Sequence, residues 1–382
     1  MDHPIYLDYA AATPVDPRVT LAMQPFTELL FYNPSATYLK AVEVRHALEH
    51  ARSMVALQLG SRPSEIIFTA GGTEADNLAI HGVMRLHPHA NVVVSAIEHE
   101  AVFSPAAEYT SRVVQPNQSG LVEPSAVAAA IDDDTVLVSV MYANNEVGTV
   151  QPIRALGQLV QDIRRDRQAR GITTPLYLHT DACQAANYLD LKVARLGVDL
   201  MTLNGGKIYG PKQSGVLYVR GGLQLKPLIS GGGQERGLRS GTENVSQVVG
   251  FAHALEIAQT IRHDESKRTQ LLQRQFTELL SKHVPQAVVN GSLKHRLPNN
   301  IHITIPGIDN ERLLIQLDEV GIMAAAGSAC SASNDEPSHV LRALGIPDQL
   351  AKSSIRFTMG HSTTSDEVSR VVTELARLVN VA

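Results

Sequence analysis

The chain has 382 residues, a formal net charge of −5 and a sequence pI of about 6.3. This acidic balance argues against direct binding of nucleic acid, which basic patches mediate, and no apolar run approaches the ~20 residues of a membrane helix. The first residues lack the basic and apolar regions of a secretory signal, and two cysteines are too few for a disulfide framework. We therefore expect a cytoplasmic protein.

Apolar strands alternate with amphipathic segments through the first two thirds of the chain. A helix expected from about 42 to 59 places Val44 and Val55 on one apolar face, and Gly60 can supply its left-handed end. Three strands follow helical patterns, at 91–96, 135–140 and 175–180. This alternation predicts an α/β protein with a mostly parallel sheet covered by helices.

The pattern changes after about residue 260. A polar helical stretch is followed by a strand near 300–305, a helix at 309–320 and a closing helix that starts with the capping-box spacing of Thr364 and Glu367. A chain of this length has room for two domains. We predict a large domain at 14–260 and a small α/β domain formed by 1–13 and 261–382.

The segment from 65 to 75 is typical of a strand, a glycine turn and a helix. Gly71 and Gly72 leave the first backbone amides of the helix uncovered, and Thr73 is expected to add a hydroxyl at the cap. Helix N-termini bind phosphate because unpaired N–H groups and the helix dipole both favour an anion. We therefore predict Gly72 and Thr73 as phosphate ligands, although such junctions also occur as simple tight turns.

Two apolar stretches end at residues that suit a cofactor. Asp181 follows the strand expected at 175–180, and Lys207 follows a second apolar run and the pair Gly205 and Gly206. Taken alone, a turn aspartate or a surface lysine is the commoner interpretation. Together they suit pyridoxal phosphate (PLP), whose aldehyde needs a lysine Schiff base and whose ring nitrogen needs an anionic partner.

The motifs along the chain resemble, in order, those of a cysteine desulfurase of the NifS/IscS type, a relative of the class V aminotransferases. They lie at 6–14, 71–74, 98–99, 144–148, 179–181, 206–212, 236–242 and 327–330. The resemblance extends over nearly the whole chain. It implies the PLP-dependent transferase fold (fold type I), with a large sheet domain and a smaller C-terminal domain that carries a catalytic cysteine.

The resemblance also implies the reaction, in which L-cysteine becomes L-alanine and its sulfur passes to the enzyme. Lys207 holds the cofactor and then acts as the general base at Cα, while Asp181 pairs with the ring nitrogen. His99 matches a histidine that stacks on the ring and moves protons. No metal ligand is among the implied residues.

The two cysteines have different expected roles. Cys183 lies beside a strand end and is expected to be a small buried hydrophobic residue. Cys330 lies in a run of small residues at 324–334, which is typical of a loop. Because sulfur transfer needs a nucleophilic thiolate that can carry the product away, the resemblance assigns this role to Cys330, which would hold the sulfur as a persulfide.

Further residues match binding positions of the family. Asn145 and Gln184 correspond to residues that hydrogen-bond the ring oxygen of the cofactor. Arg356 corresponds to the arginine that binds the substrate carboxylate, for which a guanidinium is suited, and Asn33 is expected to assist it. Thr242 matches a residue that the other subunit lends to the phosphate site, so a homodimer is implied.

The chain departs from the family pattern in two places. Asn204, Gly205 and Gly206 stand where the family has a serine, a small residue and a histidine, so one phosphate contact is missing. Either the affinity for the cofactor is lower or Asn204 replaces that contact. The usual histidine and glycine are absent around 38–41. Alternative functions are a selenocysteine lyase, a cystine C–S lyase or a catalytically impaired PLP-binding sulfur carrier. The sulfur acceptor, in cluster assembly, tRNA thiolation or DNA modification, stays open.

Overall fold

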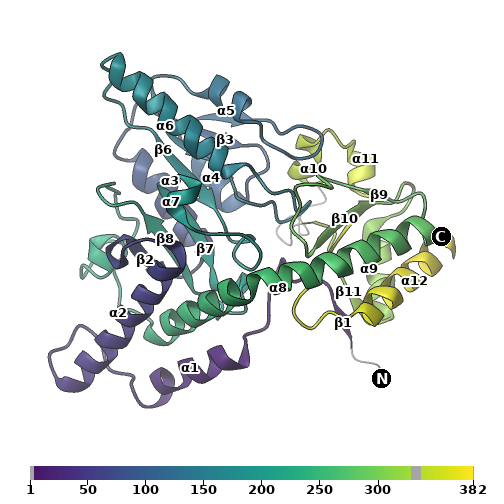
Figure 1. Cartoon of the computed structure of the whole chain (residues 1–382), viewed down its shortest axis with the longest axis horizontal. Helices are drawn as coiled ribbons and strands as arrows, with labels where there is room; N and C mark the ends of the chain where they lie inside the picture. Colours follow the sequence, from purple (N-terminus) through teal and green to yellow (C-terminus); the bar gives the residue numbers. More distant parts are fainter. Residues whose placement is uncertain (1–3, 328–336, 382) are drawn as a thin grey trace.

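A seven-stranded sheet forms the centre of the larger part of the molecule (Figure 1). The computed structural model describes residues 4–327 and 337–381. Neighbouring strands pair in parallel except at β8, which is antiparallel to both β7 and β2, so the predicted mostly parallel sheet is confirmed. In spatial order the strands are β2 (Ile66–Thr69), β8 (Gly215–Val219), β7 (Leu200–Asn204), β6 (Tyr177–Asp181), β5 (Thr135–Ser139), β3 (Asn91–Ser95) and β4 (Thr110–Val114).

The sequence of the central strands follows from their position between two layers of helices. Strands β3 and β5 are buried at every residue, and both are apolar except at their ends. A strand covered on both faces has no water-facing side, so it needs no polar alternation. The helices connecting the sheet strands are α3 (Gly72–Met84), α4 (Glu100–Ala107), α5 (Pro124–Ala130), α6 (Ile153–Ala169) and α7 (Val193–Leu196).

Two helices near the N-terminus pack on the first half of a long helix. Helices α1 (Pro17–Glu28) and α2 (Leu39–Leu59) contact α8 (Val245–His283), which is 39 residues long. Gly60 ends α2 with φ of 65°, so the predicted left-handed terminus is confirmed. In the described parts of the chain, no helix has the length and apolar character that crossing a membrane requires.

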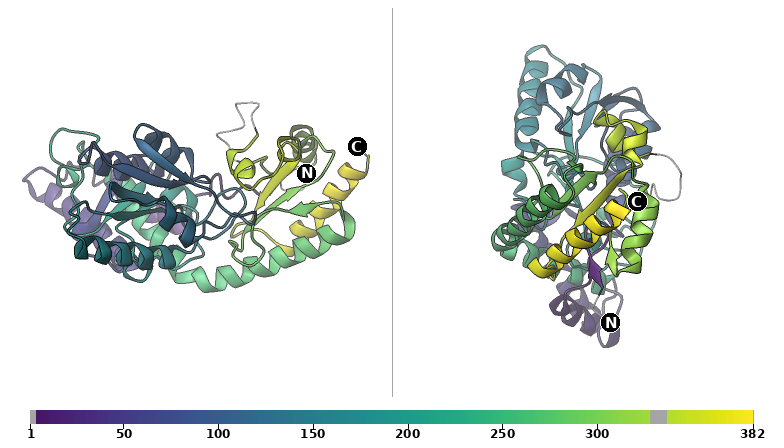
Figure 2. Two further views of the ribbon diagram at one scale, coloured as in Figure 1. Left: turned by 90° about the horizontal axis from the view of Figure 1, so that it is seen from above. Right: turned by 90° about the vertical axis from the view of Figure 1, so that its right-hand side faces the viewer.

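The second half of α8 supports a smaller set of strands and helices (Figures 1 and 2). They share a separate apolar core that contains Leu7, Phe276, Phe357 and Leu375. Its elements are β1 (Ile5–Tyr6), β9 (Val288–Val289), β10 (Asn300–Thr304), α9 (Asn310–Glu319), β11 (Ile322–Met323), β12 (Ser354–Thr358) and α12 (Ser365–Val381). Two short helices before β12, α10 (His339–Ala343) and α11 (Asp348–Ala351), pack instead on the core of the larger part. The exact domain boundaries stay a prediction, since α8 passes residue 260 without a break.

The capping box predicted at the last helix is confirmed. The backbone N–H of Thr364 donates to Glu367 Oε2 at 2.7 Å, and the N–H of Glu367 donates to Thr364 Oγ1 at 3.2 Å. Helix α12 begins at the next residue, Ser365. Each side chain therefore satisfies a backbone group that the start of the helix would leave unpaired.

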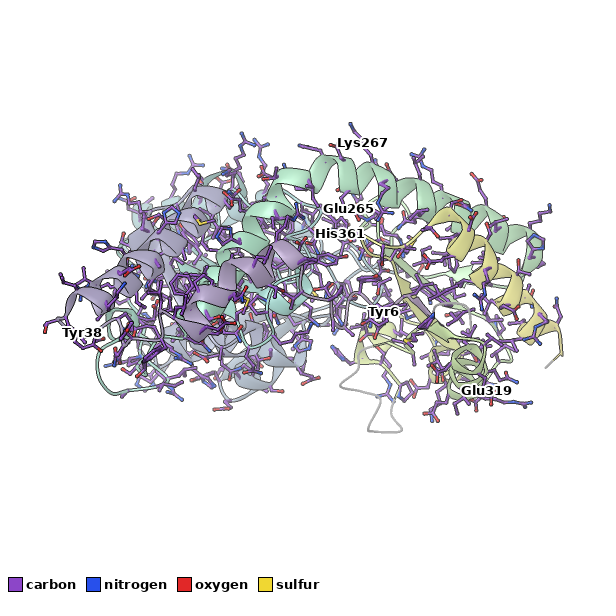
Figure 3. The ribbon with its side chains drawn as sticks, turned by 90° about the horizontal axis from the view of Figure 1, so that it is seen from below. Tyr6, Tyr38, Glu265, Lys267, Glu319 and His361 are labelled. Carbon is purple, nitrogen blue, oxygen red and sulfur yellow. The ribbon has the colours of Figure 1, made fainter. Side chains whose placement is uncertain are left out.

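The smaller part of the molecule contacts the larger part close to Lys207. The rings of Tyr209 and His361 stack with centroids 3.7 Å apart, and the backbone N–H of His361 donates to the Tyr209 hydroxyl at 2.8 Å. Arg268 on α8 donates to the Gly360 carbonyl at 2.6 Å. Figure 3 shows His361 close to Glu265, near the middle of α8. Since Tyr209 is two residues from Lys207, this junction ties both parts to the predicted site.

Candidate active site

The carboxyl ends of the parallel strands meet at one edge of the sheet, where open α/β sheets bind their ligands. A cavity of about 280 Å³ lies there. It brings together most of the residues that the sequence indicates, from six different segments of the chain. These are Gly72, Thr73, His99, Asn145, Asp181, Gln184, Asn204, Lys207 and Arg356.

Lys207 is placed by the short turn η2 (Gly205–Lys207), which follows β7 directly. Its Nζ donates to the carbonyl oxygens of Ala10 at 2.9 Å and Ala11 at 2.5 Å. Burial, reinforced by the positive charge of Arg356, lowers the pKa of Lys207 below its ordinary value. A larger fraction of neutral amine makes this lysine a better nucleophile and base near neutral pH.

Asp181 is the last residue of β6, the central strand of the sheet, which lies between β7 and β5. Its carboxylate is largely buried and lines the cavity, and Oδ1 accepts a hydrogen bond from the backbone N–H of Cys183 at 2.8 Å. The cavity wall thus holds an anionic acceptor for a protonated heterocyclic nitrogen. Cys183 itself is half-buried in the same wall.

A second carboxyl group, which the sequence did not indicate, lies behind Asp181. Asp76 on α3 is 1% exposed and lines the cavity, and its Oδ1 has no hydrogen bond and lies 3.5 Å from His179 Nε2. Burial and the charge of Asp181 raise the pKa of Asp76 well above its usual range. Burial lowers the pKa of His179 to about 4. Burial therefore favours the neutral form of Asp76 beside Asp181.

The phosphate-binding end is formed by the start of α3. An adjoining cavity of about 540 Å³ is lined by Gly71, Gly72, Thr73 and Asn204. A Cβ at Gly72 would lie 2.9 Å from Cys183 Sγ, closer than carbon and sulfur pack, so glycine is required there. The N-cap is Gly71, so the expectation that Thr73 caps the helix is wrong, because the helix already begins at Gly72. Thr73 stays a predicted phosphate ligand.

His99 is held by its own helix. It is the N-cap of α4, and its Nδ1 accepts a hydrogen bond from the backbone N–H of Ala101 at 3.1 Å. In the neutral ring the proton therefore resides on Nε2, which is available for proton transfer. Gln184 also lines the cavity, and its Nε2 donates to the Ala10 carbonyl at 3.0 Å. Asn145 also lines the cavity, as expected for a ring-oxygen ligand.

Arg356 enters the cavity from β12 of the smaller part. It is 2% exposed, and its guanidinium donates to Asp8 Oδ1 at 2.6 Å and to the Asn145 carbonyl at 3.0 Å. Its buried Nε has no hydrogen-bond partner among the described residues. A buried guanidinium that keeps an unused donor suits a carboxylate ligand, which can accept two parallel bonds.

Replacing Arg356 by lysine is expected to raise the KM for L-cysteine by roughly tenfold to a hundredfold, because one charge-assisted bond and the planar geometry are lost. Cysteamine lacks the carboxylate, so its kcat/KM is expected to change less than about twofold if only the carboxylate contact is lost. Steady-state sulfide release, the product common to both compounds, measures the difference. Equal losses for the two compounds would show that Arg356 acts on the fold instead.

Two predicted site residues, Asn33 and Thr242, are not brought to the cavity of this chain. Asn33 is exposed between α1 and α2, and its Oδ1 accepts from the Ser35 backbone N–H at 2.9 Å. Thr242 is exposed and lines a neighbouring cavity that contains Gln213. Cys330 lies outside the described residues. Their roles stay predictions.

Comparisons with known proteins agree with this geometry. A family model described as aminotransferase class-V matches residues 5–371. A cysteine desulfurase IscS of Dictyoglomus turgidum is 38% identical over 386 residues, covering 99% of this chain and 95% of the relative. A solved NifS-like protein has a TM-score of 0.90 at 31% identity, covering 99% of this chain and all of that one. The structure titled SspA in complex with cysteine has a TM-score of 0.79 at 34% identity, covering 93% and 98%.

The chain belongs to the aminotransferase class-V family, whose members are PLP-dependent enzymes. Within that family it is a member of the cysteine desulfurases of the NifS/IscS type. The predicted fold and the predicted cofactor are confirmed. The residues present fit PLP, since one connected site holds a buried lysine, a buried aspartate and a helix N-terminus whose glycine leaves no room for a side chain.

Proposed function

We propose that this chain converts L-cysteine to L-alanine and takes the sulfur onto Cys330 as a persulfide. The observation that carries the proposal is the single cavity lined by Lys207, Asp181 and Arg356. An amine, an anion and a buried guanidinium are the three groups that an amino-acid substrate and this cofactor require. Family membership and the cysteine-bound SspA structure support the same substrate.

The protein groups divide the reaction between them. When bound, the cofactor supplies an electron sink for the bonding pair left at Cα. Arg356 holds the substrate carboxylate and so orients Cα, and the amine of Lys207 accepts the Cα proton. The Cys330 thiolate attacks the substrate sulfur, so a sulfur–sulfur bond forms as the Cβ–sulfur bond breaks. Protons returned at Cβ and Cα, a role that we assign to His99 and Lys207, complete alanine.

A comparison of three substrates separates this proposal from the related lyases. With L-cysteine, L-selenocysteine and L-cystine, the desulfurase is expected to release alanine from L-cysteine in a Cys330-dependent manner. A selenocysteine lyase would retain its preferred activity in Cys330→Ala, and a cystine lyase would release pyruvate. A sulfur carrier without catalysis would bind PLP and turn over none of the three.

We also propose a homodimer that completes the phosphate site with Thr242. Apolar side chains of the α1–α2 arm are exposed, namely Leu29, Phe31, Tyr38 and Leu39. Figure 3 shows Tyr38 at the outer end of this arm. An exposed patch of this kind is typical of a subunit interface. Thr242 lies on a loop that the buried Arg52–Glu235 pair fixes against β2, so the loop is rigid enough to serve a second subunit.

Mixed dimers test whether Thr242 acts across the interface. A Lys207→Ala chain paired with a Thr242→Asp chain retains one intact site if the threonine comes from the partner, and none if it acts within its own chain. The expected result is about half the wild-type alanine production per dimer, since one site of two is complete. No recovery in purified mixed dimers would place Thr242 in the site of its own subunit.

The persulfide needs an acceptor before the enzyme can turn over again. We propose a cytoplasmic sulfur-acceptor protein that serves cluster assembly or the thiolation of a cofactor or nucleic acid. Without acceptor or thiol reductant, alanine is expected to stop near one equivalent per Cys330. Adding a candidate acceptor should restore turnover and move the sulfur, as followed with ³⁵S-labelled L-cysteine.

A further inference from the structure

The phosphate-binding end of the cavity contains a cation, Lys212 at the end of the 206–212 motif, that is not among the predicted site residues and has no part in the proposed reaction. Lys212 lines this cavity together with the glycine turn at the start of α3 and with Asn204. Among the described residues that line it, Lys207 and Lys212 carry the positive charges. Since Lys207 is committed to the cofactor aldehyde, Lys212 is the cation left for the phosphate.

The local charges leave the phosphate in need of such a cation. A phosphate monoester carries close to two negative charges near pH 7, and a helix N-terminus offers only about half a positive charge. Glu74 lines the same cavity and adds a negative charge, which Arg239 balances through an ion pair of 2.9 Å. The helix and the glycine turn alone therefore leave much of the phosphate charge unmatched.

The backbone holds Lys212 in a strained and well-anchored turn. Its neighbours Tyr209 and Gln213 have φ of 61° and 58°, a left-handed conformation that side chains other than glycine rarely adopt. The turn is fixed because the Gly205 N–H donates to the Ser214 carbonyl at 2.8 Å, and Ser214 Oγ donates to the Pro211 carbonyl at 2.6 Å. A lysine on such a turn loses less freedom when it binds an anion.

Lys212 also packs over Gly206, the glycine that directly precedes Lys207. A Cβ at Gly206 would lie 3.7 Å from Lys212 Cγ, so the lysine stem packs over that glycine. The ammonium donates one hydrogen bond to the Thr13 carbonyl, and an ammonium has three donors. We propose that Lys212 supplies the cation that binds the PLP phosphate, in the space that a side chain at position 206 would fill.

Cofactor titration separates a phosphate ligand from a residue that only holds the Thr13 loop. Apo-protein is titrated with PLP and with pyridoxal, which lacks the phosphate. In Lys212→Met the Kd for PLP is expected to rise by about tenfold to a hundredfold, as for a lost charge-assisted bond. The Kd for pyridoxal should change by less than about twofold, because only the phosphate contact is removed. Lys212→Arg should recover most of the PLP affinity.

Lys226→Met is the matched control, since this lysine is exposed on the same part of the molecule and lines neither cavity. In a second test, Gly206→His is added to Lys212→Met and should restore part of the PLP affinity without changing that for pyridoxal. Equal losses for PLP and pyridoxal, or an unchanged Kd for PLP, would overturn the proposal. The proposal rests on PLP binding alone, so failure of the sulfur chemistry leaves it standing.

Discussion

Lys207→Ala is expected to lower alanine production from L-cysteine by on the order of 10⁴-fold or more, because the covalent anchor and the base at Cα are lost together. The lysine lies in the turn η2 that follows β7 and has a lowered pKa because it is buried. Among the described residues, Lys212 is the one other lysine that lines the connected cavities. Lys212 lies on the phosphate side, so it does not replace Lys207.

Borohydride reduction followed by peptide mass mapping identifies the attached lysine. In the wild-type protein the cofactor mass is expected on the peptide that contains Lys207, and Lys207→Ala should show no labelled peptide. Lys226→Ala serves as the control for general damage to the fold. Attachment to another lysine in the wild-type protein would contradict the proposed site.

Cys330→Ser is expected to lower alanine formation by on the order of 10³-fold or more, since a hydroxyl cannot take sulfur from the substrate. The other cysteine is not an alternative nucleophile. Burial, together with the charges of Asp181 and Asp76, raises the pKa of the Cys183 thiol well above its usual range. Cys183 therefore holds almost no thiolate at neutral pH, and thiolate is the reactive form.

Mass spectrometry after a single turnover locates the sulfur. The peptide with Cys330 is expected to gain 32 Da, about the mass of one sulfur atom, whereas the Cys183 peptide should not. Cys183→Ala should retain the persulfide and thus distinguishes the two cysteines. A persulfide found on Cys183 in the wild-type protein would refute the assignment.

The sequence predicted the site residues at the ends of the strands better than those that other elements bring into the site. Asp181 and Lys207 follow apolar strands, and a side chain at a strand end is placed by the strand itself. Asp76 was missed because it lies within a helix, where sequence alone does not show that its carboxyl is buried beside Asp181. Lys212 was missed because its role depends on the strained turn around Gln213.

Three other features of the structure could not be predicted from local sequence patterns. Arg356 and Asp8 pair across nearly the whole chain, and no local pattern announces such a contact. The cap of α3 falls on Gly71 instead of Thr73, since φ of 146° at Gly71 is available to glycine and lets the helix start two residues earlier. The polar stretch near residue 260 reflects an exposed part of α8, whose two halves pack on different cores.

The most direct test of the desulfurase reaction measures four products in one sample. Purified, PLP-loaded protein is incubated with L-cysteine and a thiol reductant, and alanine, sulfide, pyruvate and ammonia are determined together. The proposed reaction predicts alanine and sulfide in equal amounts over many turnovers, without pyruvate or ammonia. Pyruvate and ammonia accompanying the sulfide, or no turnover at all, would contradict it.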